Sequence, residues 1–439
     1  MQPMRAAVVG GGWAGCAAAI ALARRGARVT LFEAAPVLGG RARTVLRDGL
    51  SLDNGQHVLL GAYTATRALA ALLHAGQSPF VQIPLALRAL VPRGLQLRAR
   101  ALPGSLGLAA GLMCARGLSW RERIANARWF SHWQRRAFAC DPDATVTDLM
   151  STLPTRAAAQ VWAPLCVAAL NTPPARASGQ VFLNVLAAAF GARRDASDLL
   201  MPAGSLGAVV PDAAVNWLLS SGHSVRLGVT ASIESALEEG VHIAAAGTVD
   251  PFDAAVIAVG PHQLARAFAS SVAEEPKLAA ALQATSGYDY ESITTIYLGY
   301  RGARVAVPSG LVRLDDDPGQ WLFERADVLR SAGDDAPRLD QLFAMVISTS
   351  GPHDGAPQSD LVRACDAQLR RARPALPALA WSQVIAERRA TYACVPRLAH
   401  PDPRVLPRVC LAGDYVYPRF PATLEAAVRS GEAAAQALS

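Results

Sequence analysis

The sequence predicts an α/β protein in which a parallel sheet flanked by helices carries an inserted α+β domain. Two observations carry this prediction. Near the start, a glycine-rich loop stands between an apolar run and an alanine-rich segment with helical spacing. Near the end, another apolar run is followed by Gly413-Asp414 and a second alanine-rich segment. Strand, glycine loop and helix in this order are typical of a Rossmann-type domain, which binds a dinucleotide at its strand ends.

The composition indicates a globular chain. Hydrophobic residues make up 51% and charged residues 18% of the 439 residues, so two or three domains are expected. No run reaches the ~18 apolar residues that a spanning helix needs, and the N-terminus has no signal-peptide pattern. We therefore expect a cytoplasmic location, either free or peripheral on the inner face of the cytoplasmic membrane.

The net charge and the cysteines indicate which classes of binding partner to expect. The net charge of +7 is carried almost wholly by arginine, since Lys277 is the single lysine. The arginine excess fits either a coding bias or attraction to anionic lipid or phosphate. Without zinc-finger spacing, a basic-aromatic stripe or a basic tail, we expect no nucleic-acid partner. The seven cysteines form no CxxC pair and predict reduced core thiols, not a metal site.

The first strand, loop and helix lie in residues 5–25. Residues 5–9 predict a strand, and residues 13–25 predict a helix that ends at Gly26. The loop glycines permit a tight turn and close approach of the backbone to a pyrophosphate. The start of the helix offers unpaired N–H groups to the phosphates. The predicted binding residues here are Gly10, Gly12, Trp13, Ala14 and Gly15.

An acidic residue follows the second predicted strand, residues 28–32. The carboxylate of Glu33 is suited to accept hydrogen bonds from ribose hydroxyls, which argues against NADP. The motif alone leaves NAD and FAD open. A second glycine run follows, where the backbone can pass close to a ligand and an arginine can pair with pyrophosphate. Its predicted binding residues are Gly39, Gly40, Arg41 and Arg43.

The remaining strands of the first domain come from later in the chain. They are predicted at residues 226–233, 240–245, 254–259 and 409–412, and a last helix follows at 425–438. The first domain is therefore expected to consist of residues 1–60, 200–265 and 390–439. The inserted substrate domain is expected to consist of residues 61–199, mainly helical, and 266–389. The latter part has predicted strands at 292–300, 342–349 and 381–388.

The stretch from Leu102 to Phe138 is apolar at first and then rich in Arg, Trp and Phe. One interpretation is a peripheral membrane contact through which a lipid-soluble substrate enters. The other is a pair of helices that pack on the core of the substrate domain. The sequence leaves both open.

The glycine–arginine run and the C-terminal tail together resemble the amine oxidase and phytoene desaturase superfamily of flavoproteins. The resemblance implies FAD, bound by a GR2-like Rossmann domain. It implies that the backbone of Val229 meets the adenine and that Asp414, after Gly413, hydrogen-bonds the ribityl or pyrophosphate end. It also implies that the start of the last helix, at Thr423 and Leu424, faces the flavin pyrimidine and stabilises negative charge there.

Three narrower stretches resemble the squalene-associated FAD-dependent desaturases, the hydroxysqualene dehydroxylases of hopanoid synthesis. They are "LDNGQHVLLGAY" at 52–63, "MPAGSLG" at 201–207 and the tail "LAGDYVYPRFPATLEAAVRSGEAAA". The resemblance implies that an allylic alcohol, hydroxysqualene, loses hydroxide with the help of an acid. Reduced flavin then delivers hydride and gives squalene. An apolar isoprenoid substrate and upstream squalene-pathway synthases are the partners this implies.

Candidates for the acid are His57, which titrates near neutral pH, and Tyr415 and Tyr417, which follow the Asp414 motif. Each also has a plain structural interpretation, as a histidine bonded to backbone or as packing aromatics. Two alternative functions stay open: a phytoene-type isoprenoid desaturase and a non-catalytic flavin-binding scaffold in isoprenoid transfer. An amine oxidase is disfavoured, because the lysine that such enzymes often place near the flavin has no counterpart except the distant Lys277.

Overall fold

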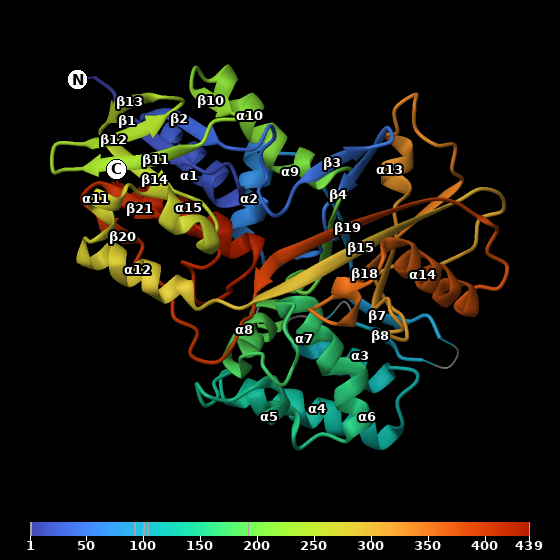
Figure 1. Ribbon diagram of the computed structural model, residues 1–439. Coiled ribbons are helices and arrows are strands. Elements are labelled where there is room, and N and C mark those ends of the chain that lie inside the picture. Colours follow the sequence, from blue (N-terminus) through green and yellow to red (C-terminus); the bar gives the residue numbers. More distant parts are fainter. Residues whose placement is uncertain (1, 92–93, 100–101, 103–104, 192, 439) are drawn as a thin grey trace.

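The computed structural model describes residues 2–91, 94–99, 102, 105–191 and 193–438. A six-stranded sheet forms one end of the molecule, in the order β10-β2-β1-β14-β21-β20 (Figure 1). All neighbours pair in parallel except β20 and β21. The strands are β1 (Arg5–Val9), β2 (Arg28–Glu33), β10 (Ser224–Leu227), β14 (Ala254–Ile257), β20 (Arg404–Leu406) and β21 (Val409–Leu411). The predicted α/β class is confirmed.

Alternate side chains of β1 point to two different cores. Ala6 and Val8 pack with helices on one face, whereas Ala7 and Val9 pack with an antiparallel meander on the other. Gly431 fixes the closest helix contact, since a Cβ there would lie 2.2 Å from the backbone oxygen of Ala14. The helices are α1 (Trp13–Arg24), α10 (Pro211–Ser220) and α15 (Leu424–Leu438). The meander is β11 (Ala231–Ala236), β12 (Val241–Ala245) and β13 (Thr248–Phe252).

One predicted strand of the first domain is wrong. Residues 226–233 were expected to form a single strand, but the chain turns at Gly228, where φ is +69°. The part before the turn is β10 of the parallel sheet, and the part after it is β11 of the meander. A positive φ suits glycine and breaks an extended strand, so one apolar run serves two sheets.

A seven-stranded sheet forms the second half of the molecule, in the order β19-β15-β18-β17-β16-β7-β8. It is antiparallel except where β16 meets β7. The strands are β7 (Ala86–Ala89), β8 (Gln96–Arg98), β15 (Tyr290–Tyr300), β16 (Leu311–Arg313), β17 (Trp321–Glu324), β18 (Gln341–Ser348) and β19 (Leu379–Tyr392). The three strands predicted in residues 266–389 are thus confirmed. The helix α14 (Gln358–Ala372) covers one face through Leu361, Cys365 and Leu369.

Helices cover the other face of this sheet and form the far end of the molecule (Figure 1). They are α3 (Ser105–Cys114), α4 (Trp120–Arg135), α5 (Val146–Met150), α6 (Thr155–Ala157), α7 (Ala163–Leu170) and α8 (Gly179–Phe190). Residues 61–199 are therefore helical in large part, but β7, β8 and β6 (Phe80–Ile83) interrupt them. Each of these short strands pairs with a strand from later in the chain or with its own neighbour. No helix among the described residues is both long and apolar enough to cross a membrane.

Small elements join the two halves. The hairpin of β3 (Thr44–Arg47) and β4 (Leu50–Asp53) follows the second glycine run. The helix α2 (Thr64–Leu73) packs against α15 and shares the core of the parallel sheet through Leu69 and Ala70. The other connecting elements are β5 (Leu59–Leu60), β9 (Leu199–Pro202), α9 (Leu206–Val209), α11 (Ser270–Ala273), α12 (Pro276–Ser286) and α13 (Ala326–Arg330).

Candidate functional site

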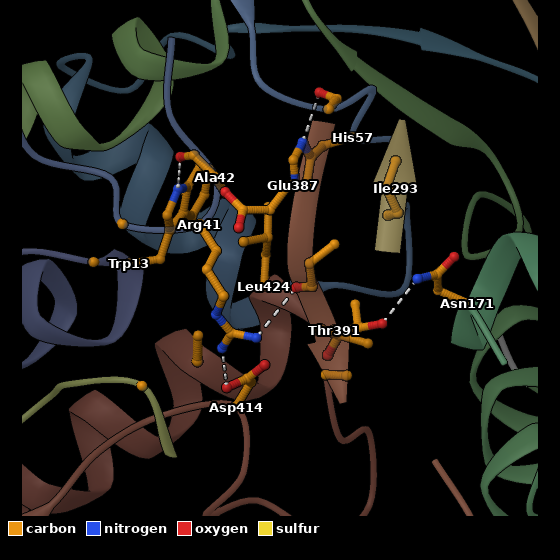
Figure 2. Close-up of a pocket in the computed structure, with 18 of the residues that line it drawn as sticks. Trp13, Arg41, Ala42, His57, Asn171, Ile293, Glu387, Thr391, Asp414 and Leu424 are labelled. Carbon is orange, nitrogen blue, oxygen red and sulfur yellow. Dashed lines mark hydrogen bonds and ion pairs between the residues drawn. The ribbon is translucent and has the colours of Figure 1, made fainter. Parts of the chain in front are cut away.

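A cavity of about 1170 Å³ lies at the carboxyl ends of β1, β2, β14 and β21. It continues between β19 and the helices α7 and α8 into the second half of the molecule (Figure 2). Ligands of open parallel sheets bind in this position, outside the carboxyl ends of the strands. All but three of the predicted site residues line the cavity; the exceptions are Gly15, Tyr415 and Tyr417.

The first glycine loop is shaped by backbone contacts. Gly10 has φ +103°, and a Cβ there would lie 2.6 Å from the backbone oxygen of Ala258. A Cβ at Gly15 would lie 1.8 Å from the oxygen of Gly10. Gly15 therefore permits the tight turn but does not line the cavity. Gly12 differs, because a Cβ there would meet nothing within 4 Å. Its open side faces the cavity, which leaves the backbone free for close approach of a ligand.

The carboxylate of Glu33 holds this loop and also lines the cavity. Its Oε2 accepts a hydrogen bond from the N–H of Gly11 at 2.6 Å, and its Oε1 accepts one from Ala35 at 2.8 Å. The backbone oxygen of Glu33 accepts from the N–H of Val229 at 2.9 Å. This bond brings Val229 to the cavity wall beside the acid. Each carboxylate oxygen keeps acceptor capacity for a hydroxyl group.

The second glycine run lies directly against the first. The N–H of Gly39 donates to the oxygen of Gly11 at 2.8 Å, and Gly39 and Gly40 both have positive φ. The indole of Trp13 donates to the oxygen of Ala42 at 3.0 Å. The two glycine-rich runs therefore form one cradle at the start of α1.

An arginine and an aspartate from opposite ends of the chain meet at the floor of the cradle. Nη2 of Arg41 lies 2.6 Å from Oδ1 of Asp414, and Nη1 of Arg41 donates to the oxygen of Ala390 at 3.2 Å (Figure 2). Burial alone would lower the pKa of Arg41, but the Asp414 carboxylate outweighs it and raises that pKa above its ordinary value. Arg43, which donates to the oxygen of Gly40, adds a second cation beside the pair.

The start of α15 closes the cradle. Oγ1 of Thr423 accepts from the N–H of Ala426 at 3.1 Å and so caps the helix. Gly413 is held by Ser430, whose Oγ accepts its N–H at 2.8 Å. Thr423 and Leu424 line the cavity, so the partial positive charge of this helix N-terminus is directed at it.

His57 lines the cavity but does not present a proton donor there. Its Nδ1 lies 2.9 Å from the backbone oxygen of Gly55, and a carbonyl only accepts, so Nδ1 carries the hydrogen. Burial lowers the pKa of His57, which favours the neutral ring. The free Nε2 is then an acceptor. The expected role of His57 as the acid is not supported by this geometry.

The structure does not bring Tyr415 and Tyr417 to the cavity. The side chain of Tyr415 is wholly buried in the core beneath the meander. The ring of Tyr417 stacks on Phe420 with centroids 6.2 Å apart, and Arg429 lies over it. Both match the packing interpretation.

Residues of β19 line the cavity, and the sequence reasoning missed them. Glu387 lies in register with Ile293 of β15, and both side chains line the cavity (Figure 2). Among the described residues, the Glu387 carboxylate has no hydrogen-bond or ion-pair partner. The only available signal was a charged side chain within an otherwise strand-like run, which is usual for an exposed strand face.

The far half of the cavity is an apolar chamber. Helices α7 and α8 supply one wall and the seven-stranded sheet supplies the other. Asn171, at the end of α7, ties the two walls together, because its Nδ2 donates to Oγ1 of Thr391 and its Oδ1 accepts from the N–H of Thr349, both at 3.0 Å. The chamber lining includes Leu165, Phe182, Val185, Leu186, Phe190, Leu311, Trp321, Phe323 and Val346.

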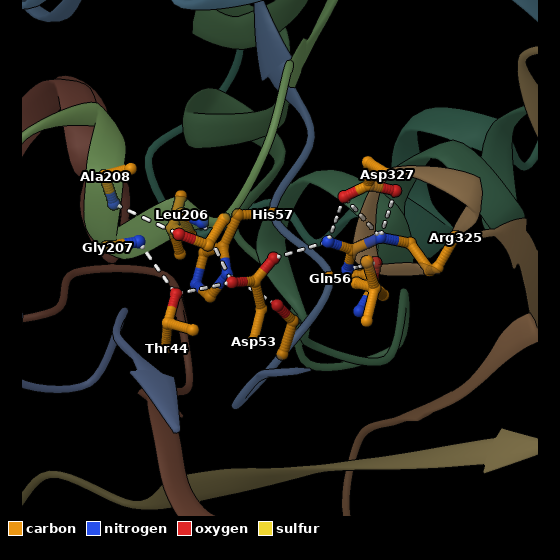
Figure 3. Close-up of polar contacts among 12 residues, drawn as sticks. Thr44, Asp53, Gln56, His57, Leu206, Gly207, Ala208, Arg325 and Asp327 are labelled. Carbon is orange, nitrogen blue, oxygen red and sulfur yellow. Dashed lines mark hydrogen bonds and ion pairs between the residues drawn. The ribbon is translucent and has the colours of Figure 1, made fainter. Parts of the chain in front are cut away.

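Asp53, the first residue of the "DNGQH" run, belongs to a buried ion-pair network (Figure 3). Oδ2 of Asp53 lies 3.0 Å from Nη2 of Arg325, a residue that precedes α13, and Nη1 of Arg325 donates to Oε1 of Gln56 at 2.8 Å. Arg325 also pairs with Asp327 at 2.8 Å. On its other side, Oδ1 of Asp53 accepts from the N–H of Leu206, within the "MPAGSLG" stretch, at 2.9 Å. The network fixes the loop that carries His57.

The family model described as flavin containing amine oxidoreductase matches residues 13–439. Hydroxysqualene dehydroxylase of Rhodopseudomonas palustris is 29% identical, over 98% of this chain and 96% of its own length. Hydroxysqualene dehydroxylase of Sinorhizobium fredii is 26% identical, over 99% and 98%.

Solved structures show the same fold at lower identity. An oxidoreductase from Methanosarcina mazei superposes with a TM-score of 0.74 at 15% identity, covering 99% of this chain and 100% of that one. Cyclohexylamine oxidase from Brevibacterium oxydans superposes with a TM-score of 0.68 at 19% identity, covering 100% and 99%. The likeness extends over both halves of the molecule.

Proposed function

Because the chain belongs to the flavin-containing amine oxidoreductase family, and its cofactor is therefore FAD, we propose that it removes the hydroxyl group of hydroxysqualene reductively and releases squalene. The observation that carries this proposal is the apolar chamber that opens directly into the dinucleotide cradle. Two relatives of full length and modest identity bear the name of this activity, which supports the same substrate class.

The cradle fits FAD. The open side of Gly12 and the start of α1 suit a pyrophosphate, and Arg41 and Arg43 supply positive charge beside it. The carboxylate of Glu33 suits the adenosine ribose, and the capped start of α15 suits the electron-rich end of a reduced flavin. When bound, reduced FAD supplies a hydride.

The chain's own residues have three tasks in this reaction. The chamber walls hold the apolar chain and exclude water, which protects an allylic cation from hydration. A proton must reach the leaving hydroxyl oxygen so that it departs as water. Glu387 is the carboxyl group of the cavity wall that has no hydrogen-bond or ion-pair partner among the described residues. The acceptor Nε2 of His57 is suited to orient the hydroxyl group through a hydrogen bond.

The function is tested by incubating the purified, dithionite-reduced protein anaerobically with hydroxysqualene, squalene or phytoene. We expect conversion of hydroxysqualene to squalene and no reaction of the other two. Desaturation of phytoene by the oxidised protein, without dehydroxylation, would identify a phytoene-type desaturase. Bound flavin with no turnover of any substrate would favour a flavin-binding scaffold.

The role of Glu387 is tested with Glu387→Gln. The amide cannot supply the proton, so turnover is expected to fall about 100-fold or more while FAD content stays normal. Glu239→Gln, which removes the same charge from an exposed turn, is the matched control and should leave turnover unchanged. Equal turnover of the two variants would remove Glu387 from the mechanism.

A further inference from the structure

The positive charge of this chain is concentrated in one segment. Residues 81–140 contain ten arginines and a single acidic residue, Glu122, which is a net charge of +9. The whole chain carries +7, so the remainder is slightly acidic. A coding bias toward arginine would not by itself place the charge in this way.

The structure arranges part of this charge on one helix face. Four basic residues of α4 follow a spacing of seven, four and three residues, which places them on one side of the helix. All four are exposed: Arg121, Arg128, His132 and Arg135. The opposite side of α4 is buried in the core. In Figure 1, α4 lies at the end of the molecule away from the parallel sheet.

These arginines have no acidic partners in the part of the chain that the structure describes. No ion pair of the described residues involves Arg121, Arg128 or Arg135, although arginines elsewhere in the chain commonly pair with a carboxylate. The one carboxylate of the segment, Glu122, is already engaged by the helix cap at Ser119 and by Arg156. The face is thus an uncompensated cationic surface.

Large apolar side chains stand exposed at both ends of this surface. Trp120, the first residue of α4, is 61% exposed. Leu106, near the start of α3, is 62% exposed. Nε2 of Gln134 donates to Oγ of Ser105 at 2.8 Å, which places the start of α3 beside the end of α4. Basic and exposed apolar side chains therefore share the α3–α4 hairpin.

We propose that the α3–α4 hairpin docks the protein on an anionic lipid bilayer. The arginines meet lipid headgroups, and Trp120 and Leu106 enter the interface between headgroups and acyl chains. A basic face alone would also suit a nucleic acid, but exposed leucine and tryptophan beside it suit a bilayer. The hairpin packs on α8, which lines the apolar chamber, so docking brings the chamber close to a membrane-dissolved substrate; this last consequence alone rests on the proposed function.

The charge requirement is tested by sedimentation of the FAD-loaded protein with vesicles. Vesicles of phosphatidylcholine alone are compared with vesicles that also contain phosphatidylglycerol, and we expect binding to the anionic vesicles only. The triple variant R121Q/R128Q/R135Q should bind them on the order of 100-fold more weakly. The control R24Q/R25Q/R28Q removes the same charge from exposed positions around the end of α1 and should bind as the wild type does. Equal weakening by both triple variants, or no preference for anionic vesicles, would overturn the proposal.

The apolar requirement separates a bilayer from other polyanions. The variant L106S/W120S should bind anionic vesicles at least tenfold more weakly, because two interfacial anchors are lost. Both positions are exposed, and unchanged flavin content and circular dichroism will show that the fold is intact. Wild-type affinity of L106S/W120S for vesicles, together with competition by a DNA duplex, would show that the surface binds nucleic acid instead.

Discussion

At the scale of single residues, three of the glycines in the first loop have different roles. Gly10 and Gly15 lack a side chain because backbone atoms of the protein occupy the space. Gly12 lacks one although the protein leaves that space free and the backbone angles there, φ −71° and ψ −179°, suit any residue. The absence of a side chain at position 12 therefore leaves space for the ligand.

This difference predicts opposite effects of two similar substitutions. Gly12→Ala should leave the stability of the apoprotein unchanged but strongly reduce the FAD retained through purification, because the methyl group enters the cradle. Gly15→Ala should lower the melting temperature of the apoprotein, since its Cβ would lie 1.8 Å from a backbone oxygen. Flavin absorbance and thermal unfolding measure the two effects. A stable Gly15→Ala protein with full flavin content would contradict the assignment.

His57 allows an equally specific comparison. In His57→Gln the side chain keeps an oxygen acceptor, whereas in His57→Phe it has none. We expect His57→Phe to lower turnover of hydroxysqualene about tenfold and His57→Gln to retain more of it, with flavin content normal in both. Steady-state rates with reduced protein provide the measurement. If both variants turn over as the wild type does, His57 has only a structural role.

At the scale of elements, the network around Arg325 is a buried link between distant segments of the chain. The side chains of Arg325 and Asp53 are only 6% and 4% exposed, so neither charge is solvated if its partner is removed. The network also includes Tyr297 of β15, whose hydroxyl donates to the backbone oxygen of Asp53 at 2.8 Å. It thus holds β4, β15 and the segment before α13 in one arrangement.

Arg325→Met is therefore expected to destabilise the protein by about 3–5 kcal/mol, because the buried carboxylate of Asp53 and the partly buried carboxylate of Asp327 would be left without their cation. Arg304→Met is the control. Arg304 is 58% exposed and pairs with Glu324, so its loss should cost about 0–1 kcal/mol. Urea unfolding of the two variants gives the comparison, and similar losses of stability in both would contradict the role of the network.

A sequence reveals local patterns more readily than contacts between residues that are far apart in the chain. Glycine motifs, the acid after β2 and the last helix are local patterns. They predicted the α/β class and the FAD cofactor correctly, and most of the binding residues they indicated line the cavity. The turn at Gly228 was hidden, because an apolar run does not show that it divides between two sheets. The Arg325–Asp53 pair was hidden for another reason: its members lie 272 residues apart, and only the folded chain brings them together. Glu387 resembled a charge on an ordinary exposed strand.

At the scale of the whole molecule, the cavity depends on both halves. The parallel sheet supplies the cradle, and the seven-stranded sheet with its helices supplies the chamber. Neither half would enclose the reacting atoms alone. The burial of a histidine inside the molecule depends on elements from several segments. The pKa of its ring therefore depends on the whole fold.

The stability of the whole molecule should therefore depend on pH near neutrality. Burial lowers the pKa of His57 and His400, and both rings lie at hydrogen-bond distance from a backbone carbonyl through Nδ1. Their folded pKa lies below the ordinary value of 6.5, so the unfolded chain binds more protons at lower pH. Their stabilising contribution is complete above that value and is lost as the pH falls below it. We expect the urea midpoint to decrease between about pH 7.5 and about pH 5.5, a range in which histidine titrates. The double variant His57→Gln/His400→Gln should show a flatter dependence, whereas an unchanged slope would place the relevant titration on other groups.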